Sequence, residues 1–213
     1  MRDVLPHMAV ADTTYSEKYK SLIRNADEVR RLVDNKAALA CLAISEVRRL
    51  RQVHDGNDGL SDLEARNTPI LGRAYVIRQF KREEEISLLR QVYGRKFVQV
   101  SVYLDKDERR ELMIDKIKNF TTGIVADSDA ESQAIDLIEI DYNEVNDEFG
   151  QRVSDVFHLG DVFVRGENKP TAAQTIDRFI RAFFGDNGIS PTKTEYGMYA
   201  AAGAALSVRS ESC

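Results

Sequence analysis

Apolar side chains recur at intervals of three and four residues along much of the chain, which is the spacing of one face of an α-helix. This periodicity predicts helices over 36–52 and 172–185, and we also expect helices over 16–35, 83–93, 106–120 and 129–148. In the helix over 172–185, the apolar stripe consists of Ile176, Phe179, Ile180, Phe183 and Phe184. A glycine directly after this stripe, Gly185, predicts the end of that helix.

Three short apolar segments alternate with these helices and predict β-strands. They cover residues 75–80, 98–104 and 160–166 and are rich in Val, Ile, Tyr and Phe. Strands separated by helices imply βαβ units, and therefore a parallel sheet with right-handed crossovers. We therefore expect an α/β fold in which residues 74–80 and 97–104 lie side by side and run in the same direction.

Cationic side chains gather where the first predicted strand leads into the helix over 83–93. In open parallel sheets, ligands bind at the carboxyl ends of the strands, and a helix N-terminus adds free N–H groups. Arg78, Lys81 and Arg82 would suit a phosphate at this position. The alternative is that they pair with the three glutamates at 83–85 on a solvated surface.

Two further sets of charged residues have two interpretations each. Arg109 and Arg110 fit a mobile helix that closes over a phosphoryl group, or they are ordinary solvent-facing arginines. Asp141, Glu144 and Asp147 are spaced to hold a magnesium ion through water. Acidic residues at this spacing also form the polar face of a helix, so both interpretations stay open.

Composition narrows the class of protein. The 213 residues carry a net charge of −5, which argues against nucleic-acid binding, because phosphate contacts need clustered Lys and Arg. Cys41 and Cys213 are too few for a disulfide framework, and without a signal peptide they indicate a cytoplasmic protein. The longest apolar run, 196–206, is too short to span a membrane. His158 has apolar neighbours in "VFHLGDVFV", so we expect a buried structural histidine.

Four catalytic signatures are absent from the sequence. A P-loop phosphotransferase needs G-x-x-x-x-G-K-[ST], and none of the 12 glycines precedes a lysine. A zinc nucleotide deaminase needs H-x-E with P-C-x-x-C, whereas the three histidines occur as "HMA", "HDG" and "HLG". Neither a G-x-S-x-G elbow nor a Cys–His pair supplies a nucleophile. The sequence therefore holds no complete catalytic centre of these types.

The order of the segments nevertheless resembles the bacterial deoxycytidylate deaminase family of anti-phage defence. The resemblance covers residues 36–206, and its most specific pieces are "GQRVSDVFHLGDVFV" and "SPTKTEYGMYAAAGAAL". In that family a P-loop-kinase-like domain precedes a zinc-dependent deaminase that depletes dCMP or dCTP during infection. The resemblance implies a lead-in over 1–35, a three-layer P-loop-kinase-like domain with a parallel sheet over 36–186, and the start of a deaminase over 187–213.

Individual residues match three motifs of the family. The matching positions are Arg78, Lys81, Glu84, Arg90, Tyr93 and Gly94; then Asp141, Glu144, Gly150, Gln151, Asp155, His158 and Asp161; and finally Glu195, Tyr196, Gly197 and Met198. Glu83 stands where the family pattern has proline. The family's first strand, its glycine-rich loop and its zinc signature have no counterpart here, so we expect a chain truncated at both ends. Zinc is accordingly expected in an intact family member and not in this chain.

The resemblance implies that this chain is the nucleotide-binding, regulatory portion of a deoxycytidine-nucleotide deaminase and is inactive alone. Its expected partners are a deoxycytidine or purine nucleotide, and a missing deaminase domain or another copy of the chain. One alternative is a nucleoside-phosphate kinase-like phosphotransferase that clamps phosphate with Arg78, Lys81, Arg109 and Arg110. The other is a non-catalytic module that associates through exposed apolar helix faces.

Overall fold

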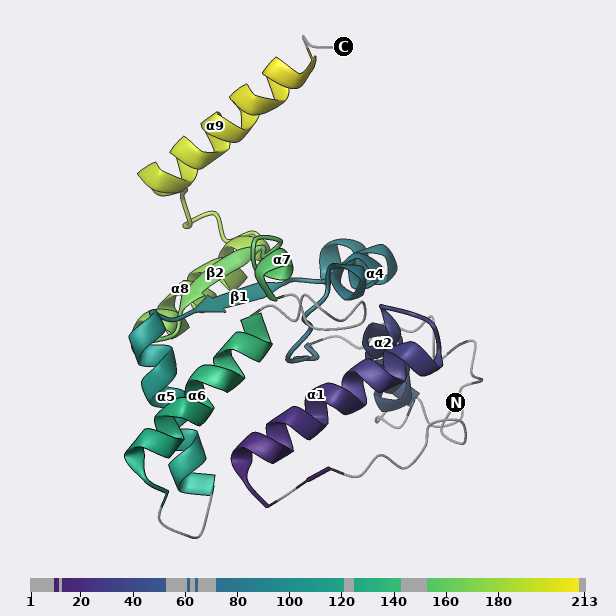
Figure 1. Cartoon of the computed structure of the whole chain (residues 1–213). Helices are drawn as coiled ribbons and strands as arrows, with labels where there is room; N and C mark the ends of the chain where they lie inside the picture. The colour runs from purple at the N-terminus through teal and green to yellow at the C-terminus, as the bar shows by residue number, and fades with distance from the viewer. Residues whose placement is uncertain are drawn as a thin grey trace. The chain divides into compact units, whose positions relative to one another are not determined.

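The computed structural model describes residues 10–11, 13–52, 61, 64, 72–120, 125–142 and 153–210 (Figure 1). The structure is α/β and mostly helical. It divides into two compact units, unit 1 (Met1–Phe163) and unit 2 (Val164–Cys213). Within the described residues, no helix is both long enough and apolar enough to cross a membrane.

Most of the regular structure belongs to unit 1. Its elements are α1 (Tyr15–Leu32), α2 (Ala38–Gln52), α4 (Glu83–Tyr93), the 3-10 turn η1 (Gly94–Lys96), β1 (Val100–Tyr103), α5 (Lys106–Phe120), α6 (Asp127–Tyr142) and α7 (Val153–Phe157). Strand β2 (Val162–Arg165) crosses the boundary, and unit 2 adds α8 (Lys169–Phe183) and α9 (Lys193–Ser210). All six predicted helices are confirmed. The helix predicted over 129–148 is confirmed as far as Tyr142, because residues 143–152 lie outside the described residues. Helix α7 was not predicted.

Local hydrogen bonds explain where several helices begin and end. Thr14 caps α1 by accepting from the Glu17 N–H at 3.2 Å, and Asn168 caps α8 by accepting from the Thr171 N–H at 3.2 Å. These side chains satisfy N–H groups that have no partner inside the helix. Gly94 ends α4 at a φ of 55°, a left-handed conformation that glycine adopts without steric cost.

The main core of unit 1 lies where α1, α5 and α6 meet (Figure 1). Ile117 of α5 packs against Ala130, Ala134 and Leu137 of α6, and all four are at most 2% exposed. The two alanines let the helices approach closely, because they carry little side-chain volume. Tyr19 of α1 packs against this cluster and links the first helix to the pair.

The sheet consists of two parallel strands, β1 and β2, and confirms the strands predicted at 98–104 and 160–166. The strand predicted at 75–80 is wrong, because residues 73–82 have no regular structure. Gln79 has a φ of 72°, which interrupts an extended backbone, and Val76 is 87% exposed. A β-forming composition stabilises a strand only when neighbours cover its faces, and that condition is not met here.

Candidate functional site

The start of α4 holds an ion pair between a buried arginine and a half-buried glutamate. Arg82 is 2% exposed, and its Nε and Nη2 donate to the two carboxylate oxygens of Glu84 at 3.2 and 3.3 Å. Burial opposes ionisation of Glu84, but the hydrogen bonds and charge of Arg82 outweigh it, so the pKa of Glu84 lies below its ordinary value. The pairing of Arg82 with a neighbouring glutamate, one of the two sequence interpretations, is therefore present, although the Arg82 side chain is buried and not on the surface.

Lys81 contacts helix α1. Its Nζ donates to the Tyr19 hydroxyl at 3.4 Å and lies 5.5 Å from the Tyr19 ring centroid. Its backbone N–H donates to Glu85 Oε2 at 3.0 Å. An anion at the N-terminus of α4 would therefore meet the carboxylates of Glu84 and Glu85, which repel it.

The predicted rim of cations at a strand's carboxyl end does not form at 78–81. Arg78 is exposed and lies in the irregular segment 73–82, so neither it nor Lys81 follows a strand. The expectation that 74–80 pairs with 97–104 is wrong for the same reason, since β1 pairs with β2.

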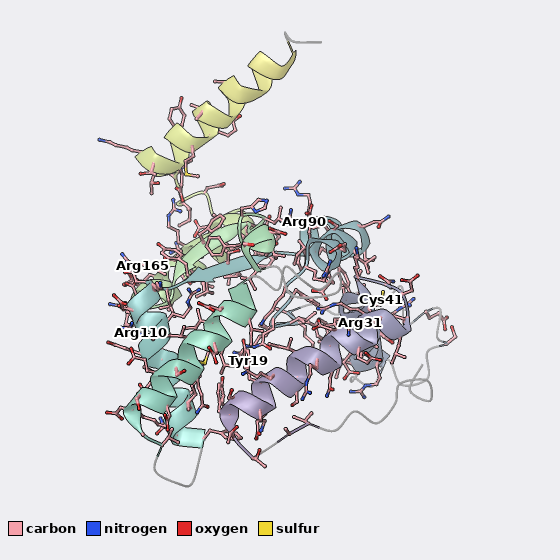
Figure 2. All side chains as sticks on the ribbon, in the orientation of Figure 1. Tyr19, Arg31, Cys41, Arg90, Arg110 and Arg165 are labelled. Carbon is pink, nitrogen blue, oxygen red and sulfur yellow. The ribbon has the colours of Figure 1, made fainter. Side chains whose placement is uncertain are left out.

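The other two predicted cations follow a real strand. Strand β1 ends at Tyr103, and α5 begins three residues later with Arg109 and Arg110 in its first turns. Arg110, labelled in Figure 2, forms ion pairs with Asp107 at 3.5 Å and with Glu131 of α6 at 3.8 Å. Within the part of the chain that the structure describes, the side chain of Arg109 forms no ion pair or hydrogen bond, and its Nε is buried. Arg109 is therefore a cation after the carboxyl end of β1 that has no ion-pair partner among the described residues.

The predicted magnesium ligands lie at the edge of the described chain. Asp141 belongs to the last turn of α6, but its side chain is outside the described residues, as are Glu144 and Asp147 entirely. Across the described ranges, no group of three or more His, Cys, Asp or Glu side chains is placed to hold a metal ion. Cys41 is a half-buried free thiol on α2.

His158 is exposed, so the prediction of a buried structural histidine is wrong. It follows the last residue of α7, and the side chain that α7 buries is Val156, which is 5% exposed. The apolar character of neighbours in sequence does not fix which side chain of a short helix turns inward.

A network of hydrogen bonds between α4, α7 and β1 was not predicted. Arg90, labelled in Figure 2, donates from Nη2 to the Leu159 carbonyl oxygen at 2.6 Å and to Asp161 Oδ1 at 3.1 Å. The other oxygen of Asp161 accepts from the Gln99 N–H at 2.7 Å. Arg90 therefore fixes Asp161 and the residues that enter β2.

Two residues of the chain around β1 complete this network. The Gln99 Nε2 donates to the Val156 carbonyl oxygen, and the Ser101 hydroxyl donates to the Phe157 carbonyl oxygen, both at 2.8 Å. Each donor adds a second hydrogen bond to a carbonyl group at the end of α7, since these carbonyls also accept from the Leu159 and Gly160 N–H groups. The only sequence signal for this network was that Arg90 and Asp161 match motifs of the resembled family. That match did not indicate that the two side chains contact each other.

Comparison with protein-family models, with curated proteins and with solved structures finds no match to this chain.

Proposed function

We propose that this chain is the nucleotide-binding, regulatory portion of a zinc-dependent deoxycytidine-nucleotide deaminase, built on a three-layer P-loop-kinase-like domain. The family resemblance over 36–206 is the reason for choosing this family. Two residues of that resemblance, Arg90 and Asp161, form one contact in the structure, which is consistent with a shared local fold.

The observation that supports nucleotide binding is the position of Arg109. It follows the carboxyl end of β1, where parallel sheets bind their ligands, and its guanidinium has no ion-pair partner among the described residues. A guanidinium donates to phosphate through charge-assisted hydrogen bonds, which are stronger than neutral ones. Arg110 is held beside it by Asp107 and Glu131, and adds positive charge to the same turn. We therefore place the phosphate at Arg109.

Calorimetric titration of the full chain with dCMP, dCTP and dATP tests this proposal. Arg109→Gln should weaken the affinity roughly tenfold or more, because a hydrogen bond to a charged group contributes about 1.5–3 kcal/mol. Lys116→Gln is the matched control, since it removes an exposed charge from the same helix, and its affinity should equal that of wild type. The absence of nucleotide binding by the wild type, or equal losses in both variants, would contradict the proposal.

The same proposal predicts that the chain does not deaminate nucleotides by itself, because the H-x-E and P-C-x-x-C signatures are absent from it. Purified protein with added zinc should release no ammonia from dCMP or dCTP. Release above that of a protein-free blank would show that another set of residues performs the chemistry.

A second function, that of a non-catalytic interaction module, is favoured by apolar side chains on unit 2. The large apolar side chains exposed on α8, α9 and the turn after α8 are Ile180, Phe183, Phe184, Tyr196, Met198 and Tyr199. Exposed apolar surface of this kind favours association between copies of a chain. Light scattering at two protein concentrations tests this: a mass that increases with concentration supports it, and a monomer at both concentrations excludes it.

A further inference from the structure

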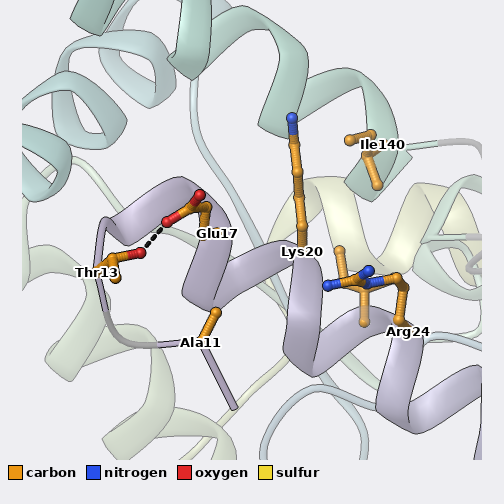
Figure 3. Close-up of a pocket in the computed structure, with 7 residues that line it drawn as sticks. Ala11, Thr13, Glu17, Lys20, Arg24 and Ile140 are labelled. Atoms are coloured by element: carbon orange, nitrogen blue, oxygen red, sulfur yellow. Dashed lines mark hydrogen bonds between the residues drawn. The ribbon is translucent and has the colours of Figure 1, made fainter. Parts of the chain in front are cut away.

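A groove lies along α1 in unit 1, and Arg109 is not among the described residues that line it. Its volume is about 490 Å³ (Figure 3). The residues that line it are Ala11, Thr13, Glu17, Lys20, Ile23, Arg24 and Ile140. All but Ile140 come from α1 or the residues before it, whereas Ile140 comes from α6.

Two cations, Lys20 and Arg24, line one end of this groove. They are four residues apart on α1 and therefore lie on the same face of the helix, as Figure 3 shows. Neither forms an ion pair or a side-chain hydrogen bond anywhere in the described ranges. Most other described arginines do have carboxylate partners, namely Arg30, Arg31, Arg49, Arg82, Arg90, Arg110, Arg165, Arg178 and Arg181.

The acidic residue in the groove does not neutralise these cations. Glu17 lies at the other end, where its carboxylate accepts hydrogen bonds from the hydroxyls of Thr13 and Thr14, and Figure 3 draws the first of these. These bonds belong to the N-terminal cap of α1. The end of the groove that carries Lys20 and Arg24 is thus separate from the end where Glu17 takes part in the helix cap.

Apolar side chains lie next to the two cations. Ile23 is 6% exposed, and Ile140 is half-buried at the end of α6. Ile140 contributes most of the aliphatic surface that an apolar ligand can cover, at about 25 cal/mol per Å² removed from water, whereas Ile23 is already buried and forms the apolar floor. A ligand for this groove therefore needs an anionic group for Lys20 and Arg24 and an apolar body for the isoleucines.

We propose that the groove binds a small organic anion, in which a phosphate or carboxylate group is joined to an apolar body. The anionic group pairs with Lys20 and Arg24, and the body packs on Ile23 and Ile140. This site is distinct from Arg109 and extends the chain's binding capacity beyond the proposed nucleotide site.

Ligand-observed NMR titration of the full chain tests this with four probes: phenyl phosphate, benzoate, inorganic phosphate and benzyl alcohol. The first two carry both the charge and the ring, and the last two carry one each. At least one of phenyl phosphate and benzoate should bind at least tenfold more tightly than inorganic phosphate and benzyl alcohol, and the tighter of the two identifies the preferred anionic group.

Variants then locate the site. Lys20→Gln combined with Arg24→Gln should weaken binding of the preferred probe at least tenfold, whereas Arg31→Gln, which removes an exposed charge from the same helix, should not change it. Ile140→Ser should weaken binding of the ring-bearing probe and leave that of inorganic phosphate unchanged. Arg109→Gln should bind the probe as wild type does, so failure of the nucleotide proposal leaves this result unaffected. Equal binding by wild type and the Lys20/Arg24 variant, or no binding of either ring-bearing anion, would overturn the proposal.

Discussion

Arg30 of α1 and Glu85 of α4 form an ion pair inside unit 1, with Arg30 Nη2 and Glu85 Oε1 separated by 2.9 Å. The two residues are 1% and 0% exposed. Arg30 also pairs with Asp27 at 2.7 Å, and Glu85 accepts a second hydrogen bond from the Lys81 N–H. Helices α1 and α4, which are far apart in sequence, are thus joined by buried charged side chains that pair with one another.

The buried ion pairs of Arg30 predict a large loss of stability in Arg30→Gln. This change removes the cation that the buried carboxylates of Asp27 and Glu85 share, and uncompensated buried charge typically costs about 3–5 kcal/mol. The free energy of unfolding, measured by urea denaturation, should fall by roughly that amount. Glu46→Gln is the control, because Glu46 pairs with Arg49 on the surface and an exposed pair contributes only about 0–1 kcal/mol. Equal losses of unfolding free energy in the two variants would show that the buried pair stabilises the fold no more than the surface pair does.

Gly160 predicts a second, steric effect. A Cβ atom at this position would lie 2.9 Å from Ser101 Cβ, closer still to the Ser101 hydroxyl oxygen, and 3.4 Å from the Phe157 carbonyl oxygen. Gly160→Ala should therefore lower the free energy of unfolding by about 1–3 kcal/mol, the usual cost of overpacking.

A matched glycine provides the control for this experiment. A Cβ at Gly197, within α9, would have no heavy atom within 4 Å, and alanine favours helix over glycine. Gly197→Ala should cause no loss of stability. In the Gly160→Ala background, Ser101→Gly should recover part of the loss, and no recovery would exclude the steric explanation.

The hydrogen bonds of Glu195 predict that the stability of unit 2 depends on pH. Its carboxylate accepts from the Thr192 N–H at 2.7 Å and from both Nη atoms of Arg178 at 2.7 and 2.9 Å. The backbone hydrogen bond and then Arg178 lower the pKa of Glu195 below its ordinary value of 4.5. Because the folded pKa is lower than the unfolded one, this stabilisation is complete above pH 4.5 and is lost as the pH falls through the folded pKa.

The measurement is an NMR titration of the Glu195 carboxyl carbon. Its midpoint should lie below 4.5 in wild type and move upward in Arg178→Gln. Arg181→Gln is the control, because Arg181 pairs with Asp186 and Asp177 instead, and it should leave the midpoint unchanged. A wild-type midpoint at the ordinary value would contradict the contact.

The helices were predictable from sequence because their signal is local. The apolar spacing along 172–185 identifies α8, and Gly94 identifies the end of α4. The segment 75–80 failed because its Val, Ile and Tyr content is also compatible with an irregular backbone. Whether it forms a strand depends on a neighbouring strand and on the φ of Gln79, and neither can be read from composition.

The candidate site was predictable in part. Arg109 and Arg110 were predicted to lie on a helix, and the structure places both in α5, which follows β1. That Arg110 is held by Glu131 while Arg109 is not depends on how α5 packs on α6. The contact between Arg90 and Asp161 joins residues 71 positions apart, and neither residue carries a local signal of its partner.

The backbone bond from the Asp161 N–H to the Gln99 carbonyl oxygen, 2.9 Å long, joins the chain just before each of the two strands. Between these residues lie α5, α6 and α7. Bringing such distant positions together costs conformational entropy that grows with the logarithm of the intervening length, and distant pairing slows folding. We therefore expect the adjacent helices α5 and α6 to associate early, and the sheet to close as a late, rate-limiting event.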